Sequence, residues 1–405
     1  MINGRVNLLH LEVSNLCNAA CPCCPRFFEN SPNVTKTLKL GYISYETFVE
    51  WFPVEFLNKV NFLLFCGNHG DPGTNPDLAK IINYCASTEV QKIQVHTNGG
   101  MKTTKFWSEV AHALKNYHGT GELIFSVDGL EDTNHIYRRN VKWDKLVANM
   151  KTVGEINPGR ENGGFDFFWE YLVFQHNEHQ IEEAKERAKE YGFCSIVFKK
   201  PVNLDDGENI TPVPVYDKEG KFEYWLQPTK LDRFKPSYLG NNPKEVFKHK
   251  RADLYKDEIK HFDYIAKDPE GYRLAVEEGN KIPISPKCKS NDLYIEADGQ
   301  VHPCCFVATG YSKMKVGYEK GSLAYPNRLQ YLTLQDKAGF EKFNLNTYSM
   351  EQIFKNKVIH KLFYNKFNDT VEDGKPLVCI EYCGNRNALD EIFDDGKIKV
   401  SDEQV

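Results

Sequence analysis

Three cysteines near the amino terminus carry the clearest chemical signal in the sequence. They are Cys17, Cys21 and Cys24, in the spacing Cys-x3-Cys-x2-Cys. A helix would align these positions on one face, but Pro22 and Pro25 argue against it, since a proline inside a helix costs about 3 kcal/mol. We therefore expect a loop that gathers three thiolates with no fourth ligand close by. That donor set suits a metal cluster with one open corner.

Two other interpretations of this loop stay open. Structural zinc usually takes four ligands supplied as pairs, and no Cys or His pair follows within reach in the sequence. A disulfide would require an oxidising compartment, and the stretch from Met1 to Val6 begins no charged-then-apolar signal segment. We therefore expect a cytoplasmic protein. Within the loop, Cys23 could compete with Cys24 as a ligand.

Short apolar runs alternate with helical patterns from residue 8 to about residue 200. We expect strands at 8–14, 60–66, 92–97, 122–127, 167–174 and 195–198, and helices at 45–56, 77–86, 104–115, 143–156 and 178–191. Six strand and helix repeats with parallel crossovers predict the fold class α/β, as a partial (β/α)6 barrel. In such barrels the chemistry collects at the carboxyl ends of the strands, and the cysteine loop follows the first strand.

Glycine-rich turns follow the second, third and fourth expected strands. They lie at 66–73, 97–100 and 125–130. Glycines and prolines of this kind permit backbone to approach a ligand closely, although each segment taken alone is also an ordinary turn. Their positions at successive strand ends favour a shared ligand site near the cysteine loop.

At the cysteine loop the sequence resembles the radical S-adenosylmethionine (SAM) enzymes, whose hallmark is this spacing after a first barrel strand. The resemblance implies a 4Fe-4S cluster held by Cys17, Cys21 and Cys24, with the amino and carboxylate groups of SAM on the fourth iron. It also implies a low-potential electron donor such as flavodoxin or ferredoxin. Reduction would split SAM into methionine and a 5'-deoxyadenosyl radical, which abstracts a hydrogen atom from the substrate.

The resemblance extends to the three turns, which are similar to family segments that line the SAM site. The family patterns are Gly-Gly-Glu-Pro, Thr-Asn-Gly, and Ser-x-Asp-Gly followed by an arginine. The residues carried over as SAM contacts are Gly70, Asp71, Asn98, Ser126, Asp128 and Arg139. The first turn departs from its pattern, because His69 and Asp71 replace Gly and Glu. Arg138 is the alternative to Arg139 for pairing with the SAM carboxylate, a bidentate geometry that suits arginine.

A second group of cysteines lies in the carboxyl-terminal third. The pattern Cys-x10-Gly-x4-Cys resembles the start of the SPASM domain, and its shorter ending resembles the reduced version called the twitch domain. This implies an α+β twitch-like domain with one auxiliary 4Fe-4S cluster held by Cys288, Cys304, Cys379 and Cys383. Cys305 is a rival of Cys304, and four such thiolates would also suit zinc. A hairpin that turns at Asp298-Gly299 is expected to carry Cys304.

Length and composition fit a soluble globular chain of two domains. The 405 residues have 41% apolar content and a formal charge of −5, with no run near the roughly 18 apolar residues that cross a bilayer and no electrostatic footprint for duplex nucleic acid. Cys66, Cys85 and Cys194 are expected to be core residues. The expected organisation has four parts: a barrel over 1–200, a segment over 201–280 that is an insertion, a linker or a lid, an auxiliary-cluster domain over 281–395, and a tail over 396–405.

The resemblance implies a choice of substrates. Most relatives with such carboxyl-terminal domains modify peptides or proteins by oxidation, crosslinking or epimerisation, which is the first expectation. A small-molecule dehydrogenase or rearrangement enzyme of natural-product or sugar metabolism is the alternative, and it fits a single auxiliary cluster. A metal-binding scaffold that never cleaves SAM is a third possibility.

Overall fold

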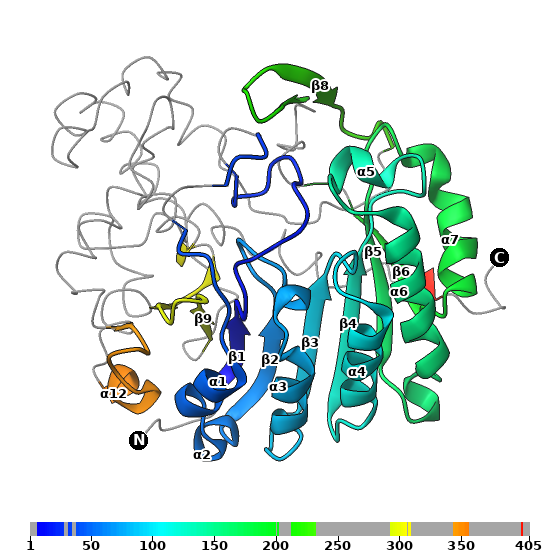
Figure 1. The fold of residues 1–405 in the computed structure, drawn as a ribbon. Helices are drawn as coiled ribbons and strands as arrows, with labels where there is room; N and C mark the ends of the chain where they lie inside the picture. Colours follow the sequence, from blue (N-terminus) through cyan, green and yellow to red (C-terminus); the bar gives the residue numbers. More distant parts are fainter. Residues whose placement is uncertain are drawn as a thin grey trace, which may run out of the picture.

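The computed structural model describes residues 6–27, 31–34, 38–199, 201, 212–231, 292–305, 307–308, 343–355 and 398–399. Over residues 6–199, six parallel strands alternate with helices, which confirms the expected α/β class (Figure 1). The strands are β1 Val6–Leu11, β2 Val60–Phe65, β3 Lys92–Thr97, β4 Thr120–Ser126, β5 Asp166–Leu172 and β6 Ser195–Lys199. They pair in chain order, so neighbours in sequence are neighbours in the sheet.

The helices between these strands lie near the predicted positions. The α-helices are α1 Tyr45–Trp51, α2 Val54–Leu57, α3 Leu78–Cys85, α4 Thr104–Lys115, α5 Asn134–Tyr137, α6 Trp143–Ile156 and α7 Ile181–Glu190, and the short 3-10 helices are η1 Pro72–Thr74, η2 Arg160–Asn162 and η3 Glu178–Gln180. The helix expected at 45–56 is divided, because Pro53 cannot continue α1. Ser44 begins α1 by accepting a hydrogen bond from the Thr47 backbone N–H.

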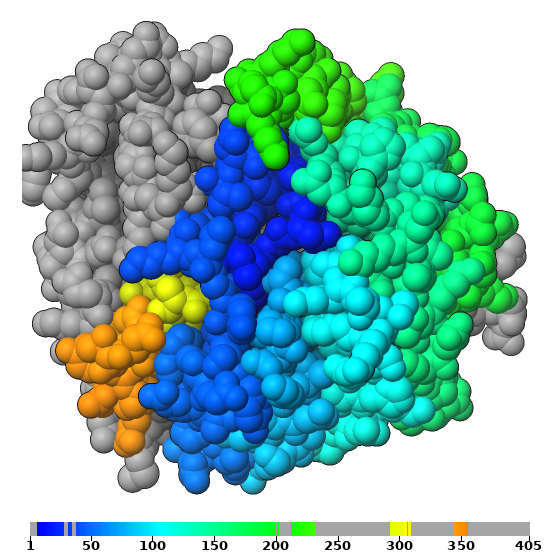
Figure 2. Space-filling model, in the orientation of Figure 1, coloured from blue at the N-terminus to red at the C-terminus, as the bar shows by residue number. Residues whose placement is uncertain are grey.

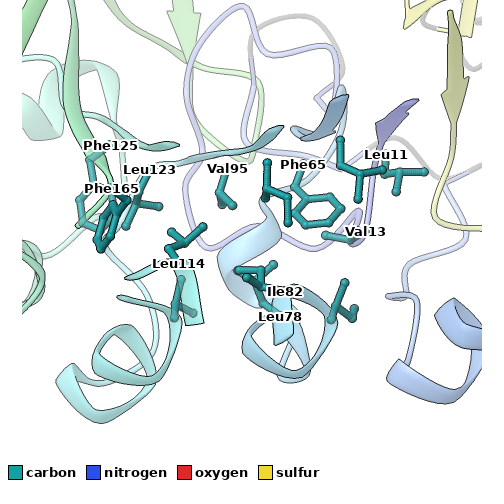
Figure 3. Packing of buried hydrophobic residues seen from close by; sticks show 14 of the residues in the cluster. Leu11, Val13, Phe65, Leu78, Ile82, Val95, Leu114, Leu123, Phe125 and Phe165 are labelled. Carbon is teal, nitrogen blue, oxygen red and sulfur yellow. The ribbon is translucent and has the colours of Figure 1, made fainter. Parts of the chain in front are cut away.

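The hydrophobic core lies between the helices and one face of the sheet. Figure 3 shows Leu11, Phe65 and Val95 from the strands facing Leu78 and Ile82 from α3. Burying a side chain of this size contributes about 1.5 to 3 kcal/mol. Side chains alternate along each strand, so the next residues face the opposite, concave side of the sheet. That side carries many polar residues.

Two described segments outside the six repeats extend the main sheet. The hairpin of β9 Leu293–Ile295 and β10 Val301–His302 adds to the edge of the main sheet, where β9 runs parallel to β1. The predicted hairpin is therefore confirmed, with Gly299 in a left-handed conformation at its turn (φ 85°). At the other edge, β11 Ile398–Lys399 pairs antiparallel with β6. Helix α12 Met350–Lys355 also belongs to the described residues.

A second hairpin lies above the carboxyl ends of the strands. It consists of β7 Val213–Tyr216 and β8 Phe222–Leu226, an antiparallel pair within the stretch expected to be an insertion or linker (Figure 1). The Tyr224 hydroxyl donates to the Ile136 carbonyl at 2.6 Å, which fixes the hairpin to α5. The hairpin therefore borders the edge at which the cysteine loop emerges.

Candidate metal centre and cofactor site

The cysteine loop follows β1 and is held at its start and near its middle by backbone hydrogen bonds. The Asp71 N–H donates to the Leu16 carbonyl at 2.8 Å, and the Ala20 N–H donates to the Arg139 carbonyl at 2.9 Å. Within the loop, Cys23 adopts a left-handed conformation (φ 66°), which is uncommon for residues other than glycine. The segment is a loop, as Pro22 and Pro25 predicted. In the space-filling view, the dark blue amino-terminal segment lies recessed below the green hairpin (Figure 2).

The three motif cysteines share one electrostatic environment. Burial raises the pKa of Cys21 to about 12 and raises those of Cys17 and Cys24, and each of these thiols is close enough to another for their charges to interact. Nearby Arg138 favours the thiolate of Cys21 and of Cys24. The three groups are therefore thiols unless a bound cation favours their deprotonation, which is how metals bind cysteine.

Cys23 differs from the motif cysteines in its surroundings. It packs against a separate apolar cluster of Phe174, Val215 and Leu226, beneath the β7–β8 hairpin. Cys17 and Cys24 instead pack against the main core. The Cys23 thiol is nevertheless close enough to those of Cys21 and Cys24 for their charges to interact, so the choice of Cys24 as the third ligand stays a prediction.

Arg138, which is partly buried, forms an ion pair with buried Asp128 beside Cys21. The Arg138 Nε lies 2.5 Å from Asp128 Oδ2, and an Nη atom of Arg138 lies 3.8 Å from the Cys21 sulfur. The Asp128 side chain is fully buried and accepts a further hydrogen bond from the Leu172 N–H at 2.6 Å. Asp128 thus holds a guanidinium against the cysteine loop.

Arg139, the arginine expected to reach SAM, makes different contacts. It forms an ion pair with Glu223 at 2.6 Å and donates to the Tyr216 carbonyl at 3.2 Å, so its guanidinium joins the β7–β8 hairpin. Two adjacent residues at this turn point to different partners, and a sequence pattern alone does not tell which one faces the loop. A SAM contact of Arg139 stays a prediction.

Asp71 and Asn98 connect two strand ends to the cysteine loop. Asp71 accepts hydrogen bonds from the Thr97 hydroxyl at 2.7 Å, the Gly73 N–H at 2.8 Å, and the backbone and side-chain amides of Asn98 at 2.7 and 2.8 Å. The Asn98 amide also lies 3.6 Å from the Cys17 sulfur. Burial raises the pKa of Asp71, and these donated hydrogen bonds act in the opposite direction. Asp71 and Asn98 thus both lie at the carboxyl ends of the strands beside the cysteine loop, where the sequence predicted them.

Gly70 lies where a side chain has no room. A Cβ atom there would be 2.1 Å from the Ser14 carbonyl oxygen and 2.3 Å from the Asn15 Cα. Its N–H donates to Glu12 Oε1 at 3.0 Å, and the His69 N–H donates to the same oxygen at 2.6 Å. Glu12 and Arg26 are also buried beside this turn and were not among the predicted site residues. A charged residue within an apolar stretch of sequence does not indicate which distant group it will contact.

Ser126 and Cys66 lie at the carboxyl ends of β4 and β2, which β3 separates in the sheet. Ser126 ends β4 and pairs in register with Glu170 of β5. Cys66, expected in the core, is half-buried and interacts with Glu170, Asp71 and Glu12, which place it near the concave face. The other two cysteines expected in the core, Cys85 and Cys194, do belong to it or pack against it.

The predicted auxiliary-cluster ligands are only partly described. Cys304 follows β10 and packs against the main core, and the Cys305 carbonyl accepts a hydrogen bond from the Asn68 amide at 2.9 Å. Cys288, Cys379 and Cys383 lie outside the described residues. The auxiliary cluster and the choice between Cys304 and Cys305 therefore stay predictions.

Within the described ranges, no three His, Cys, Asp or Glu side chains converge as closely as a single bound ion requires. A four-iron cluster makes a different demand, because each cysteine binds a different iron. No helix among the described residues is both long enough and apolar enough to cross a membrane.

Comparison with known proteins gives structural similarities at low identity. No family model and no curated protein matches the sequence. SuiB of Streptococcus suis bound to precursor peptide SuiA has a TM-score of 0.43 and 13% identity, covering 93% of this chain and 71% of SuiB. The enzyme anSMEcpe with bound AdoMet has a TM-score of 0.43 and 14% identity, covering 96% and 95%.

A further similar structure is the coproporphyrinogen III oxidase HemN from Escherichia coli, a radical SAM enzyme, with a TM-score of 0.34 and 10% identity over 84% of this chain and 76% of HemN. The described residues themselves form an α/β protein whose parallel sheet presents three cysteines, a partly buried arginine and a fully buried aspartate at one carboxyl edge.

Proposed function

We propose that this chain is a radical SAM enzyme that reductively cleaves SAM to a 5'-deoxyadenosyl radical and abstracts a hydrogen atom from its substrate. One observation carries the proposal: the Cys-x3-Cys-x2-Cys loop follows β1, with its thiols close together at the edge where Asp71, Asn98 and Arg138 also meet. The donor set of thiols beside a guanidinium fits an iron–sulfur cluster, whose potential depends on nearby charge and hydrogen bonds.

The chain's own residues have distinct roles in this proposal. Cys17, Cys21 and Cys24 hold the 4Fe-4S cluster, and Asn98 and Arg138 lie against two of their sulfurs. When bound, the cluster and SAM supply an electron and the deoxyadenosyl radical. Gly70, Asp71, Ser126 and Asp128 shape the surrounding edge. The guanidinium beside Cys21 belongs to Arg138 rather than to Arg139.

The substrate proposed first is a peptide or protein, which would be oxidised, crosslinked or epimerised. An auxiliary 4Fe-4S cluster on Cys288, Cys304, Cys379 and Cys383 would accept an electron from the substrate radical, and a flavodoxin or ferredoxin would supply the first one. In this organisation the domain over 281–395 begins with a hairpin that also belongs to the main sheet. The second candidate, a small-molecule dehydrogenase or rearrangement enzyme, is favoured by the polar concave face of the sheet.

The decisive test compares two sets of cysteine substitutions after anaerobic reconstitution with iron and sulfide. The triple variant C17A/C21A/C24A should yield no 5'-deoxyadenosine with dithionite and SAM, and should retain about half of the iron, at the carboxyl-terminal site. The control C194A should behave like the unmodified protein. Formation of 5'-deoxyadenosine by the triple variant would refute the assignment, and a complete lack of it in the unmodified protein would favour a metal-binding scaffold.

A further inference from the structure

The β7–β8 hairpin lies over the side of the cysteine loop that carries Cys23. Val215 of β7 and Leu226 of β8 form a small apolar cluster with Phe174, and all three side chains are at most 1% exposed. Cys23 packs against this cluster, whereas Cys24 packs against the main core. Because two of the three cluster residues belong to the hairpin, moving the hairpin away would uncover Cys23.

The backbone of Cys23 has a conformation that is unfavourable for a residue with a Cβ atom. Its φ is 66°, in the left-handed region. A residue keeps such a conformation only where the surrounding structure imposes it. The contact with the apolar cluster beneath the hairpin is one such constraint, so the hairpin and the cysteine loop are packed as one unit.

Arg139 joins the cysteine loop to the hairpin through both its backbone and its side chain. Its carbonyl accepts a hydrogen bond from the Ala20 N–H of the loop at 2.9 Å. Its guanidinium lies 2.6 Å from the Glu223 carboxylate of β8 and donates to the Tyr216 carbonyl of β7 at 3.2 Å. One residue thus contacts the loop and both strands of the hairpin.

Two further hydrogen bonds fix the hairpin at other points. The Tyr224 hydroxyl donates to the Ile136 carbonyl at 2.6 Å, at the end of the hairpin nearest α5. At the turn between the strands, the Asn33 side-chain amide donates to the Lys218 carbonyl at 2.9 Å. Asn33 follows the cysteine loop in sequence, so the turn is also held by the segment that it overlies.

The contacts of the hairpin are weak enough to open locally. The side chains of Arg139 and Glu223 are 21% and 36% exposed, and an ion pair that solvent reaches contributes little. Among the described residues, the cluster beneath the hairpin has three buried members, whereas the main core extends across the sheet. Segments with few buried apolar contacts open more readily than the whole protein unfolds. The hairpin can therefore open while the barrel stays folded.

We infer that the β7–β8 hairpin is a cover that limits the access of solvent and dissolved oxidants to the cysteine loop, and that Arg139 and Glu223 are positioning residues that keep it closed. This role of Arg139 needs no contact with SAM. Shielding of the thiols is independent of the proposed function, whereas protection of an iron–sulfur cluster by the same cover rests on it.

The experiment measures how fast iodoacetamide alkylates individual cysteines of the metal-free full chain, reduced beforehand and kept anaerobic. Peptide mass spectrometry gives separate rates for Cys23 and for Cys85. Cys85 is fully buried in the main core, so its rate reports unfolding of the barrel. Local opening of the hairpin accelerates only Cys23, because alkylation follows the population of the open form.

Substitutions of the ion pair should accelerate alkylation of Cys23 and leave the rate at Cys85 unchanged. E223Q should raise the Cys23 rate by about threefold, as expected for one partly exposed ion pair. R139Q also removes the hydrogen bond to the Tyr216 carbonyl and should raise it by about tenfold. R139K keeps the charge and should lie between the unmodified protein and R139Q. The double variant R139Q/E223Q should react no faster than R139Q, since the pair is already broken.

E219Q is the matched control for the loss of one negative charge. Glu219 is exposed at the turn of the same hairpin, and its substitution should leave both alkylation rates unchanged. Unchanged alkylation of Cys23 in E223Q and R139Q, or equal acceleration at Cys23 and Cys85, would overturn the inference. Weaker SAM binding by R139Q alone, with no faster alkylation, would overturn it in favour of Arg139 as a SAM contact.

The reconstituted protein separates this inference from the proposed function. Transfer of iron to the chelator bathophenanthroline disulfonate should accelerate in E223Q by the same factor as alkylation of Cys23, with unchanged initial iron content. Equal iron release from E223Q and the unmodified protein would overturn the protective role of the cover. If the unmodified protein forms no 5'-deoxyadenosine, only the radical SAM assignment fails, because the alkylation rates of the metal-free chain still decide whether the hairpin is a cover.

Discussion

The ion pair between Asp128 and Arg138 contributes to the electrostatics beside the cysteine loop. Asp128 is fully buried, and its interaction with Arg138 at 2.5 Å compensates both charges. Removing one member of such a pair leaves the other charge buried without compensation, which is costly, whereas removing both is much less so. The Arg138 guanidinium thus has a structural role in addition to its proximity to Cys21.

We predict that R138Q lowers the free energy of unfolding by about 3 to 5 kcal/mol. The double variant D128N/R138Q should recover part of this loss. R187Q, which removes an exposed arginine paired with Glu190 and Glu183 on α7, should cost no more than about 1 kcal/mol. Urea denaturation of the three variants measures these differences, and equal losses for R138Q and R187Q would contradict the buried-pair argument.

Gly70 offers a second test at the scale of one residue. G70A places a Cβ atom 2.1 Å from a backbone oxygen, so the turn after β2 must move away from the cysteine loop. We expect a loss of at least about 3 kcal/mol, the upper end of the cost of overpacking, together with reduced iron binding. G41A, whose Cβ would meet no atom within 4 Å, is the matched control and should keep its melting temperature and iron content.

The sequence predicts some site residues well and others poorly, for physical reasons. Spacing and two prolines are enough to define the cysteine loop, since both act locally. The choice between Arg138 and Arg139 depends on which side of one turn faces the loop, and that is decided by Asp128 and by the β7–β8 hairpin. Glu12 could not be identified, because its partners lie more than fifty residues away in the chain.

At the scale of elements, local signals located the strands and helices of residues 6–199. Helices α4 and α6 have the expected bounds, and Gly192 follows α7 as a left-handed residue (φ 79°), a conformation that glycine adopts readily at the end of a helix. The pairing of β9 with β1 was not predicted, since long-range strand pairing leaves no local pattern in either segment. The β7–β8 hairpin was not predicted either; its two strands pair locally, but with a register shift between Val215 and Tyr216 that interrupts the regular alternation.

The end of α7 gives a prediction at this scale. G192A introduces a side chain at positive φ and places its Cβ 2.7 Å from the Gly154 Cα of α6, so it disturbs the packing of two helices. G163A has the same φ of 79° with no atom within 4 Å, so it isolates the backbone penalty, about 1 kcal/mol. Thermal unfolding should show that G192A loses about 1 to 3 kcal/mol more unfolding free energy than G163A does. Equal losses would mean that the contact between α6 and the end of α7 does not resist the added side chain.

At the scale of the whole molecule, buried histidines couple stability to pH. Burial lowers the pKa of His10 from 6.5 to about 4, while its Nε2 donates to the Cys66 carbonyl at 2.5 Å. Between these two pKa values the unfolded chain binds the additional proton. The contribution of neutral His10 is therefore complete above pH 6.5 and is lost as the pH falls towards 4.

In the unmodified protein, protonation of His10 should lower the free energy of unfolding by at most about 3 kcal/mol as the pH falls from 6.5 to 4, and we predict that H10Q removes this part of the pH dependence. The measurement is the difference in unfolding free energy between H10Q and the unmodified protein at several pH values. N7Q, on the same strand, introduces no titrating group and should follow the unmodified protein. A difference that stays constant with pH would show that His10 does not titrate with folding.

The position of β1 has a consequence for how the protein is made. The strand that leads into the cysteine loop is flanked on one side by β2 and on the other by β9, and the latter pairing joins Leu9 to Leu293. During synthesis the ribosome must therefore release most of the polypeptide before the first strand acquires its second neighbour, and such distant pairings form slowly. The three cysteines that follow β1 therefore reach their final positions only after residues near 293 have been synthesised. We expect iron delivery to follow translation rather than to accompany it.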